Sequence, residues 1–140
     1  MIIQNQSDMN QAWEPHGDSR VYWEKNILIM ELSDGFNIEG ALVCINKAKA
    51  LIETREVLYW AFLIKLGNDD TLLPPDALHD VEQFFAWCQR EGCSAVAYTI
   101  HNTVQQYIIN QLFKDSELPC EQLKQEAAAR EWLNERLIPI

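Results

Sequence analysis

Positively charged residues are scarce in this chain of 140 residues, which has 11 Lys and Arg against 21 Asp and Glu and a formal net charge of −10. The acidic excess runs through both halves of the sequence, so no basic patch is left over. A phosphate backbone would be repelled rather than attracted. Anionic membrane surfaces are disfavoured for the same reason. We therefore expect neither a nucleic-acid partner nor a membrane.

Long hydrophobic runs and targeting signals are also missing. No stretch of the sequence approaches the roughly 20 apolar residues that a membrane-spanning helix needs. The first twenty residues have neither a basic head nor a long apolar segment, so they do not resemble a secretion signal. The few cysteines do not form the dense framework of a disulfide-rich secreted domain. These features predict a cytoplasmic protein with reduced thiols.

Sequence signals for a metal or a cofactor are absent. The closest pair of cysteines has four residues between its members, and neither a second pair nor a nearby His completes a tetrahedral set. The five glycines are isolated, so no glycine-rich loop could hold a phosphate group. We therefore predict no metal and no cofactor. The four cysteines are Cys44, Cys88, Cys93 and Cys120.

No catalytic signature stands out either. There is no Gly-x-Ser-x-Gly sequence and no cysteine within a known reactive motif. Cys44 and Cys88 lie on or beside the apolar stripes of predicted helices, where a thiol is usually inert packing. The sequence predicts that the protein is not an enzyme, although a site assembled in space from distant residues stays an open alternative.

Apolar residues, by contrast, are abundant. They make up 48% of the chain and include five Trp, five Phe and four Tyr, enough for a hydrophobic core. The length suits one domain, because two cores of half this size would each be marginal. We predict a polar N-terminal arm over residues 1–17 and a single domain over residues 18–138.

The apolar patterns alternate between strand and helix. Residues 21–23 and 27–32 form a hairpin pattern, and residues 57–66 and 93–100 are apolar runs typical of strands buried on both faces. Helical spacing follows after Asn37, after Pro74, and after Thr103 with Gln106, a capping-box pattern. A last helix is predicted from Pro119, with its inner positions at Leu123, Ala127, Leu133 and Leu137. This order predicts an α/β fold with a mixed, mostly parallel sheet of about four to five strands and covering helices.

Polar side chains follow two of the predicted strands. Asn68, Asp69, Asp70 and Thr71 come after residues 57–66, and His101 and Asn102 come after residues 93–100. The carboxyl ends of parallel strands meet at one edge of a sheet, where ligands of open α/β folds gather. One interpretation is a polar-ligand or partner site with His101 as its titratable member. The favoured interpretation is that these residues cap helices and shape turns; two adjacent carboxylates are too few to predict a cation site.

Tryptophan raises a second pair of alternatives. Trp60 lies in a predicted strand and Trp87 flanks the apolar stripe of a predicted helix. Core packing is the favoured role, but both could instead belong to an apolar pocket or an association surface. A pocket of that kind would have to be lined by Trp60, Trp87 or Tyr107.

The order of elements and several local sequences resemble the STAS fold, also called anti-anti-sigma-factor-like or SpoIIAA-like, and its divergent bacterial members in particular. The resemblance covers roughly residues 18–137. The segments that carry it are Ile27–Leu32, Gly35-Phe36-Asn37, Leu73-Pro74-Pro75-Asp76-Ala77-Leu78, Ala95-Val96-Ala97-Tyr98 and Glu131-Trp132-Leu133.

The resemblance implies a binding function, because other members of this fold bind regulatory protein partners and structurally related domains hold apolar ligands. Phosphorylation-switched members have Asp-Ser-Ser-Gly or Asp-Ser-Thr-Gly where the second helix begins. This chain has Leu73-Pro74-Pro75-Asp76 there, without a hydroxyl to modify. The phosphorylation switch therefore does not carry over.

Three functional hypotheses follow. The favoured one is a non-catalytic regulatory or binding module that contacts a protein partner or a second copy of itself as a homodimer. The alternative is a carrier of a small apolar, lipid-like ligand. The third is an enzyme with its site at the loops after strands 57–66 and 93–100, which requires His101 to converge with Asp69 or Asp70.

Overall fold

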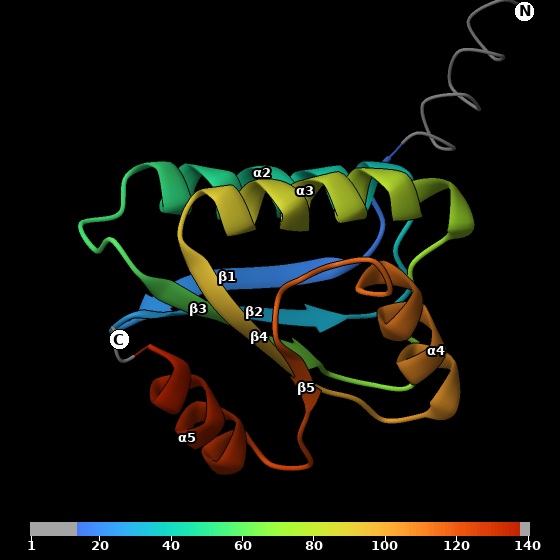
Figure 1. Ribbon diagram of the computed structural model, residues 1–140. Helices are drawn as coiled ribbons and strands as arrows, with labels where there is room; N and C mark the ends of the chain where they lie inside the picture. The colour runs from blue at the N-terminus through green and yellow to red at the C-terminus, as the bar shows by residue number, and fades with distance from the viewer. Residues whose placement is uncertain (1–13, 138–140) are drawn as a thin grey trace, which may run out of the picture.

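In the part of the chain that the structure describes, five strands form a single sheet in which spatial order equals chain order (Figure 1). The computed structural model describes residues 14–137. The first two strands are antiparallel and every later pair is parallel, which confirms an α/β protein with a mostly parallel sheet. The strands are β1 (Asp18–Glu24), β2 (Ile27–Ser33), β3 (Trp60–Leu66), β4 (Cys93–Thr99) and β5 (Cys120–Gln122).

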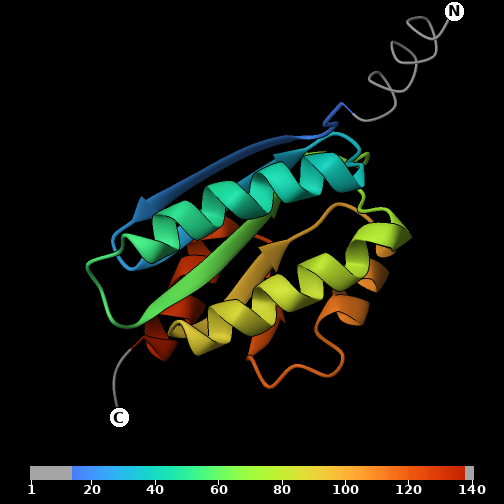
Figure 2. The same cartoon turned by 90° about the horizontal axis from the view of Figure 1, so that it is seen from above.

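Within residues 14–137, four α-helices pack around this sheet, and a short 3-10 helix, η1 (Pro75–Ala77), precedes the second of them. Helices α2 (Ile38–Glu53) and α3 (Leu78–Arg90) lie side by side over one face, and α5 (Glu126–Arg136) covers part of the other face (Figures 1 and 2). Helix α4 (Thr103–Leu112) lies beyond the carboxyl ends of the parallel strands. The region beside these strand ends is therefore enclosed by three helices.

Both faces of the central strands are buried. On the side of α2 and α3, the large cluster includes Leu28, Trp60 and Phe62, all fully buried. On the side of α5, Ile29 and Leu63 pack against the helix. This two-sided burial is the reason why β2 and β3 are apolar at successive positions instead of alternating.

Strand β3 is shorter than the apolar run from which it was predicted. The run over residues 57–66 was predicted as strand throughout, but β3 begins at Trp60. Leu58 is 73% exposed and lies in the turn after α2. Apolar residues in that turn extended the pattern without taking part in the sheet. The run over residues 93–100 likewise ends as strand at Thr99.

The C-terminal part differs more from the prediction. The last helix begins at Glu126 rather than Pro119, because Cys120–Gln122 forms a parallel edge strand with β4. Ala127 is exposed, and Ala129 takes the inner position with Leu133. A three-residue strand of Cys, Glu and Gln has no β-pattern to detect.

The capping pattern of α4 is displaced by one residue. Its N-cap is Asn102 instead of Thr103, and the side chain that reaches back is Gln105 instead of Gln106. The prediction for α2 is confirmed: the Asn37 side chain accepts from the backbone N–H of Gly40.

The described end of the predicted N-terminal arm is fastened to α2, while residues 1–13 of that arm lie outside the described residues, as do residues 138–140. Asn37 accepts a hydrogen bond from the His16 backbone N–H at 2.8 Å and donates one to the Glu14 carbonyl oxygen at 2.7 Å. Gly40 allows this close approach, since a Cβ there would overlap the His16 carbonyl oxygen.

Candidate functional site

A cavity of about 110 Å³ lies between the sheet and helices α2, α3 and α4. Its floor is formed by the carboxyl-terminal halves of β2 and β3, through Met30, Leu32, Ile64 and Leu66. The three helices supply the walls, and the segment Thr71–Leu73 closes one side. The cavity therefore lies at the carboxyl ends of parallel strands, where open α/β folds place their ligands.

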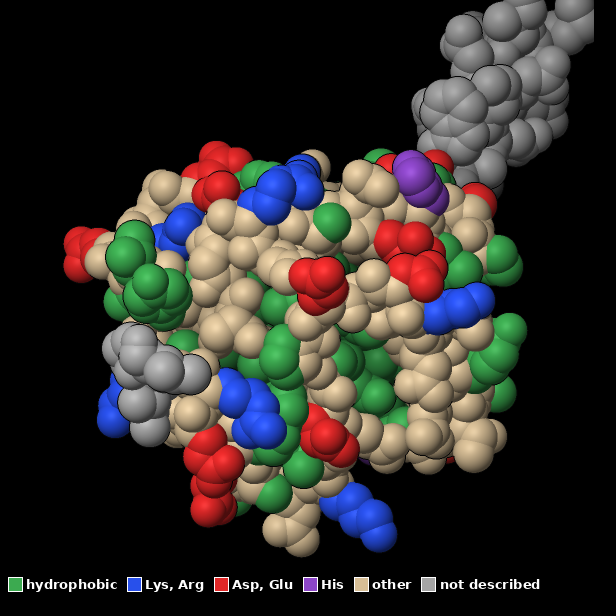
Figure 3. Space-filling view, in the orientation of Figure 1, with side chains coloured by type: hydrophobic (Ala, Val, Ile, Leu, Met, Phe, Trp, Pro, Cys, Tyr) green, Lys and Arg blue, Asp and Glu red, His purple; other side chains and the backbone are tan. Residues whose placement is uncertain are grey.

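The walls of the cavity are almost entirely apolar. Among the residues that line it, only Thr71 and Gln105 have an oxygen or nitrogen in the side chain. Seen from the side shown in Figure 3, hydrophobic side chains lie recessed near the middle of this face, with charged and polar groups standing out around them. The arrangement favours an apolar ligand over a polar one.

Gln105 links the two loops that border the cavity. Its side chain is 1% exposed, and its Nε2 donates to the Asn68 carbonyl oxygen at 2.8 Å and to the Thr71 carbonyl oxygen at 3.1 Å. Its Oε1 accepts from the His101 backbone N–H at 2.7 Å. One buried amide thus joins the loop after β3 to the loop after β4.

The residues predicted from the two loops come together in part. Asn102 caps α4 by accepting from the Gln105 backbone N–H at 2.9 Å, and it donates to the Asp69 carbonyl oxygen at 3.1 Å. The Asn68 side chain accepts from the Thr71 hydroxyl at 2.8 Å. These contacts form turns and a cap, the simpler of the two interpretations of the sequence.

His101 and Asp70 do not join this arrangement through their side chains. Both are exposed, and His101 takes part through its backbone N–H. Within residues 14–137, no hydrogen bond involves the imidazole of His101 or the carboxylates of Asp69 and Asp70; His101 and Asp69 take part only through backbone groups.

Replacing these side chains should therefore have unequal effects. We expect Asn102→Ala to lower the free energy of unfolding by about 1 kcal/mol, because the cap of α4 is lost. The double variant Asp70→Ala/His101→Ala should stay within about 0.5 kcal/mol of wild type, as exposed substitutions usually do. Urea denaturation followed by circular dichroism measures both. A double variant less stable than Asn102→Ala would show that the two side chains have contacts of their own.

Trp60 and Trp87, which the sequence suggested as possible pocket residues, do not line the cavity. Trp60 is fully buried, and its Nε1 donates to the Glu91 carbonyl oxygen at 3.0 Å. Trp87 is half-buried, with its ring centroid 6.2 Å from that of Phe84 and Lys49 Nζ 5.4 Å from its own centroid. Neither lines the cavity, and neither does Tyr107, which is 64% exposed on α4.

Burial disfavours ionisation of Cys44, Cys93 and Cys120. Burial raises the pKa of Cys44, which lines the cavity, to about 11, although a hydrogen bond with Ser19 opposes the effect. Burial raises the pKa of Cys93 and of Cys120 to about 12. All three stay protonated near neutral pH and are poor nucleophiles and metal ligands. Across residues 14–137, His, Cys, Asp and Glu form no group of three that could hold a metal ion.

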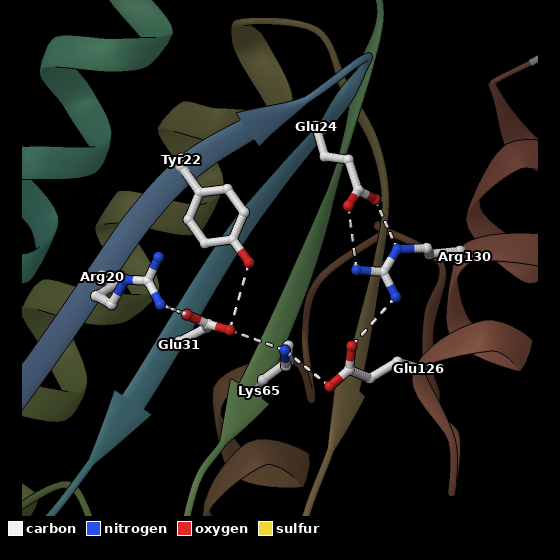
Figure 4. Close-up of polar contacts among 7 residues, drawn as sticks. All are labelled: Arg20, Tyr22, Glu24, Glu31, Lys65, Glu126 and Arg130. Atoms are coloured by element: carbon white, nitrogen blue, oxygen red, sulfur yellow. Dashed lines mark hydrogen bonds and ion pairs between the residues drawn. The ribbon is translucent and has the colours of Figure 1, made fainter.

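An ionic network occupies the opposite face of the sheet (Figure 4). Lys65 Nζ lies 2.8 Å from Glu31 Oε2 and 2.7 Å from Glu126 Oε1. Arg130 Nε lies 2.6 Å from Glu24 Oε2, and its Nη1 lies 3.2 Å from Glu126 Oε2. The network connects α5 to β1, β2 and β3.

The electrostatics of this network suit a structural role, the attachment of α5 to the sheet. The hydrogen bonds from Lys65 lower the pKa of Glu31 and of Glu126, and the hydrogen bond from Arg130 lowers the pKa of Glu24. A carboxyl group that acts as a general acid near neutral pH needs a raised pKa instead. The network therefore attaches α5 to the sheet, and its carboxyl groups are not suited to act as general acids near neutral pH.

Gln105 and the cavity were not found from the sequence. Gln105 shares one helical face with Ile109 and Leu112. A polar residue within an apolar stripe was therefore the sequence feature that could have identified it. The cavity itself has no sequence signal, since it arises from how three helices meet the sheet.

No protein-family model matches the chain, and no curated protein matches its sequence. None of the helices within residues 14–137 is both long enough and apolar enough to cross a membrane.

Proposed function

We propose that this protein is a non-catalytic binding module that holds a small apolar ligand in the cavity between the sheet and helices α2, α3 and α4. The observation that carries the proposal is the lining of the cavity, in which apolar side chains surround a space of about 110 Å³. A concave, mostly apolar site with few polar groups is the usual form of a small-molecule site. This places the apolar-ligand hypothesis ahead of the one favoured from the sequence.

Membership in the STAS-like fold is part of the same proposal. Its support is the sequential strand order after an antiparallel hairpin, with α2 and α3 on one face of the sheet. The protonated cysteines and the exposed, separate side chains of His101 and Asp70 support a role in binding rather than catalysis.

A regulatory module that contacts a protein partner or a second copy is the second candidate. Exposed apolar side chains on α4 favour it, because Val104 is 54% exposed and Tyr107 is 64% exposed. Aromatic residues on a surface often anchor a partner. Native mass spectrometry separates a dimer mass from a monomer mass, and replacement of Tyr107 by Ser should abolish a dimer that uses α4.

Filling the cavity tests the main proposal. Ala41 is buried on α2 and lines the cavity, whereas Ala50 is exposed on the same helix. We expect Ala41→Leu to abolish binding of small apolar compounds, since the added carbons occupy the space. Ala50→Leu, which adds the same atoms, should bind like wild type.

The measurement is a titration of isotope-labelled protein with a panel of neutral, charged, short and long apolar compounds, followed through the methyl resonances of Ile45 and Ile109. Both residues line the cavity. A panel in which no compound shifts these resonances would contradict the proposal. So would an Ala41→Leu variant that binds as wild type does.

A further inference from the structure

We infer that the ligand of this cavity is an uncharged molecule about the size of a single ring or a short branched chain, and not a fatty acid or phospholipid. The inference rests on the proposed function and narrows it to one chemical class. It follows from three properties of the cavity: its volume, the absence of charge from its lining, and the use that the protein already makes of its polar groups.

The volume limits the size of the ligand. The cavity measures about 110 Å³. A dry protein cavity of about 150 Å³ accommodates benzene or xenon. Sites for drug-sized ligands are larger, at about 300–1,000 Å³. A single ring or a chain of similar bulk therefore fits after small adjustments of the side chains, whereas most of a long acyl chain would lie outside the cavity.

The lining excludes a charged ligand. It contains no Lys, Arg, His, Asp or Glu. A buried charge without a partner is costly, and a carboxylate or phosphate would find no cation in this cavity. Asp69 and Asp70 are exposed in the adjacent loop, and the net charge of −10 repels anions further. An amine would likewise have no carboxylate to pair with inside.

The two polar side chains that line the cavity, Gln105 and Thr71, already use their donors within the protein. Both Nε2 hydrogens of Gln105 are used by the Asn68 and Thr71 carbonyl oxygens, and the Thr71 hydroxyl donates to Asn68 Oδ1. What is left is acceptor capacity on Gln105 Oε1 and Thr71 Oγ1. These two side chains therefore offer a ligand acceptors and no donors, which disfavours a carbonyl or carboxylate oxygen more than a neutral hydroxyl.

Four probes test the class: toluene, benzyl alcohol, benzoate and 2-naphthol, each titrated at neutral pH. Toluene and benzyl alcohol should shift the cavity resonances of the wild type. Benzoate, matched to benzyl alcohol in size but charged, should bind at least about tenfold more weakly because its charge would be buried without a partner. The two-ring 2-naphthol should be weaker than toluene by a similar factor.

The outcomes separate the inference from the proposal on which it rests. Benzoate or 2-naphthol binding as tightly as toluene, with loss of binding in Ala41→Leu, would overturn the inference and leave the apolar-ligand proposal standing. No shift from any of the four would overturn the inference, and no shift from any apolar compound would overturn both. Toluene binding equally to wild type and Ala41→Leu would place the site elsewhere and overturn both as well. If Ala41→Leu does not fold, Val81→Phe fills the cavity from α3 instead.

Discussion

Replacing Gln105 by Glu is expected to lower the free energy of unfolding by about 3 kcal/mol at neutral pH, because buried hydrogen-bonding groups lose their partners. Gln105 is 1% exposed and donates to two carbonyl oxygens, those of Asn68 and Thr71. An ionised carboxylate has no hydrogen to donate and would face both oxygens. The loop after β3 would lose two of its hydrogen bonds to α4, although the one from Asn102 to Asp69 remains.

The effect should depend on pH in a defined direction. Burial and the two carbonyl oxygens raise the pKa of the introduced carboxyl above the usual Glu value of about 4.3. Between that value and the raised pKa, the folded state binds a proton that the unfolded state has released. The variant therefore loses stability relative to wild type as pH rises through this window, and it recovers stability at lower pH.

Urea denaturation from pH 4 to pH 8 measures this difference. Gln105→Leu removes the same hydrogen bonds without adding a charge. Its free energy of unfolding should therefore differ from that of wild type by the same amount at every pH. Gln106→Glu places the same charge on the exposed neighbouring residue and should stay within about 0.5 kcal/mol of wild type. If the loss of unfolding free energy in Gln105→Glu did not change with pH, the result would contradict the burial of Gln105 between the two carbonyl oxygens.

Replacing Lys65 by Met is expected to lower the free energy of unfolding by about 2 kcal/mol at pH 7, somewhat less than for a fully buried ion pair. Lys65 lies between Glu31 and Glu126 and is the leading cause of the lowered pKa of each. Without it, the two carboxylates remain with Arg20 and Arg130 as their only cations in the network. The attachment of α5 to β3 is weakened directly.

Acid should reveal the same network. Glu24, Glu31 and Glu126 have lowered pKa values in the folded state, so the stability they contribute is fully present above the unfolded value near 4.5. It is lost as pH falls through the lowered values, because the folded state must then take up protons. In Lys65→Met the pKa values of Glu31 and Glu126 rise toward normal. The difference in unfolding free energy between the variant and wild type should therefore become smaller below about pH 4.5.

The matched control is Lys124→Met, which removes the same charge from an exposed position just before α5. It should change stability by less than about 0.5 kcal/mol at pH 7. Chemical denaturation at pH 7, 5, 4 and 3 gives the comparison for all three proteins. If the difference in unfolding free energy between Lys65→Met and wild type stayed constant down to pH 3, the network would not respond to protonation.

The strands and helices that bury the most apolar surface were predictable. Apolar runs marked β2, β3 and β4, and Asn37 marked the start of α2, because burial on both faces and side-chain capping each require particular residue types. The edge strand β5 was not predictable, since parallel pairing of Cys120–Gln122 with β4 depends on backbone groups that every residue has.

The candidate site was predictable only at its border. The loops after β3 and β4 were expected to meet, because the carboxyl ends of parallel strands share one edge of the sheet, and Asn102 does reach Asp69. The cavity beneath them depends on the angles at which α2, α3 and α4 pack. Those angles are set by many side chains together and leave no motif in the sequence.

Because each strand pairs only with its neighbours in chain order, the sheet can grow in the direction of protein synthesis. The β1–β2 hairpin needs no later residue, and each following strand adds to an edge that has already been synthesised, which suits folding on the ribosome. The hollow between the layers closes only when α4 emerges, and α5 arrives last to cover the remaining face. A nascent chain stalled before α4 would thus have most of its sheet but an open, uncovered interior that a chaperone could recognise.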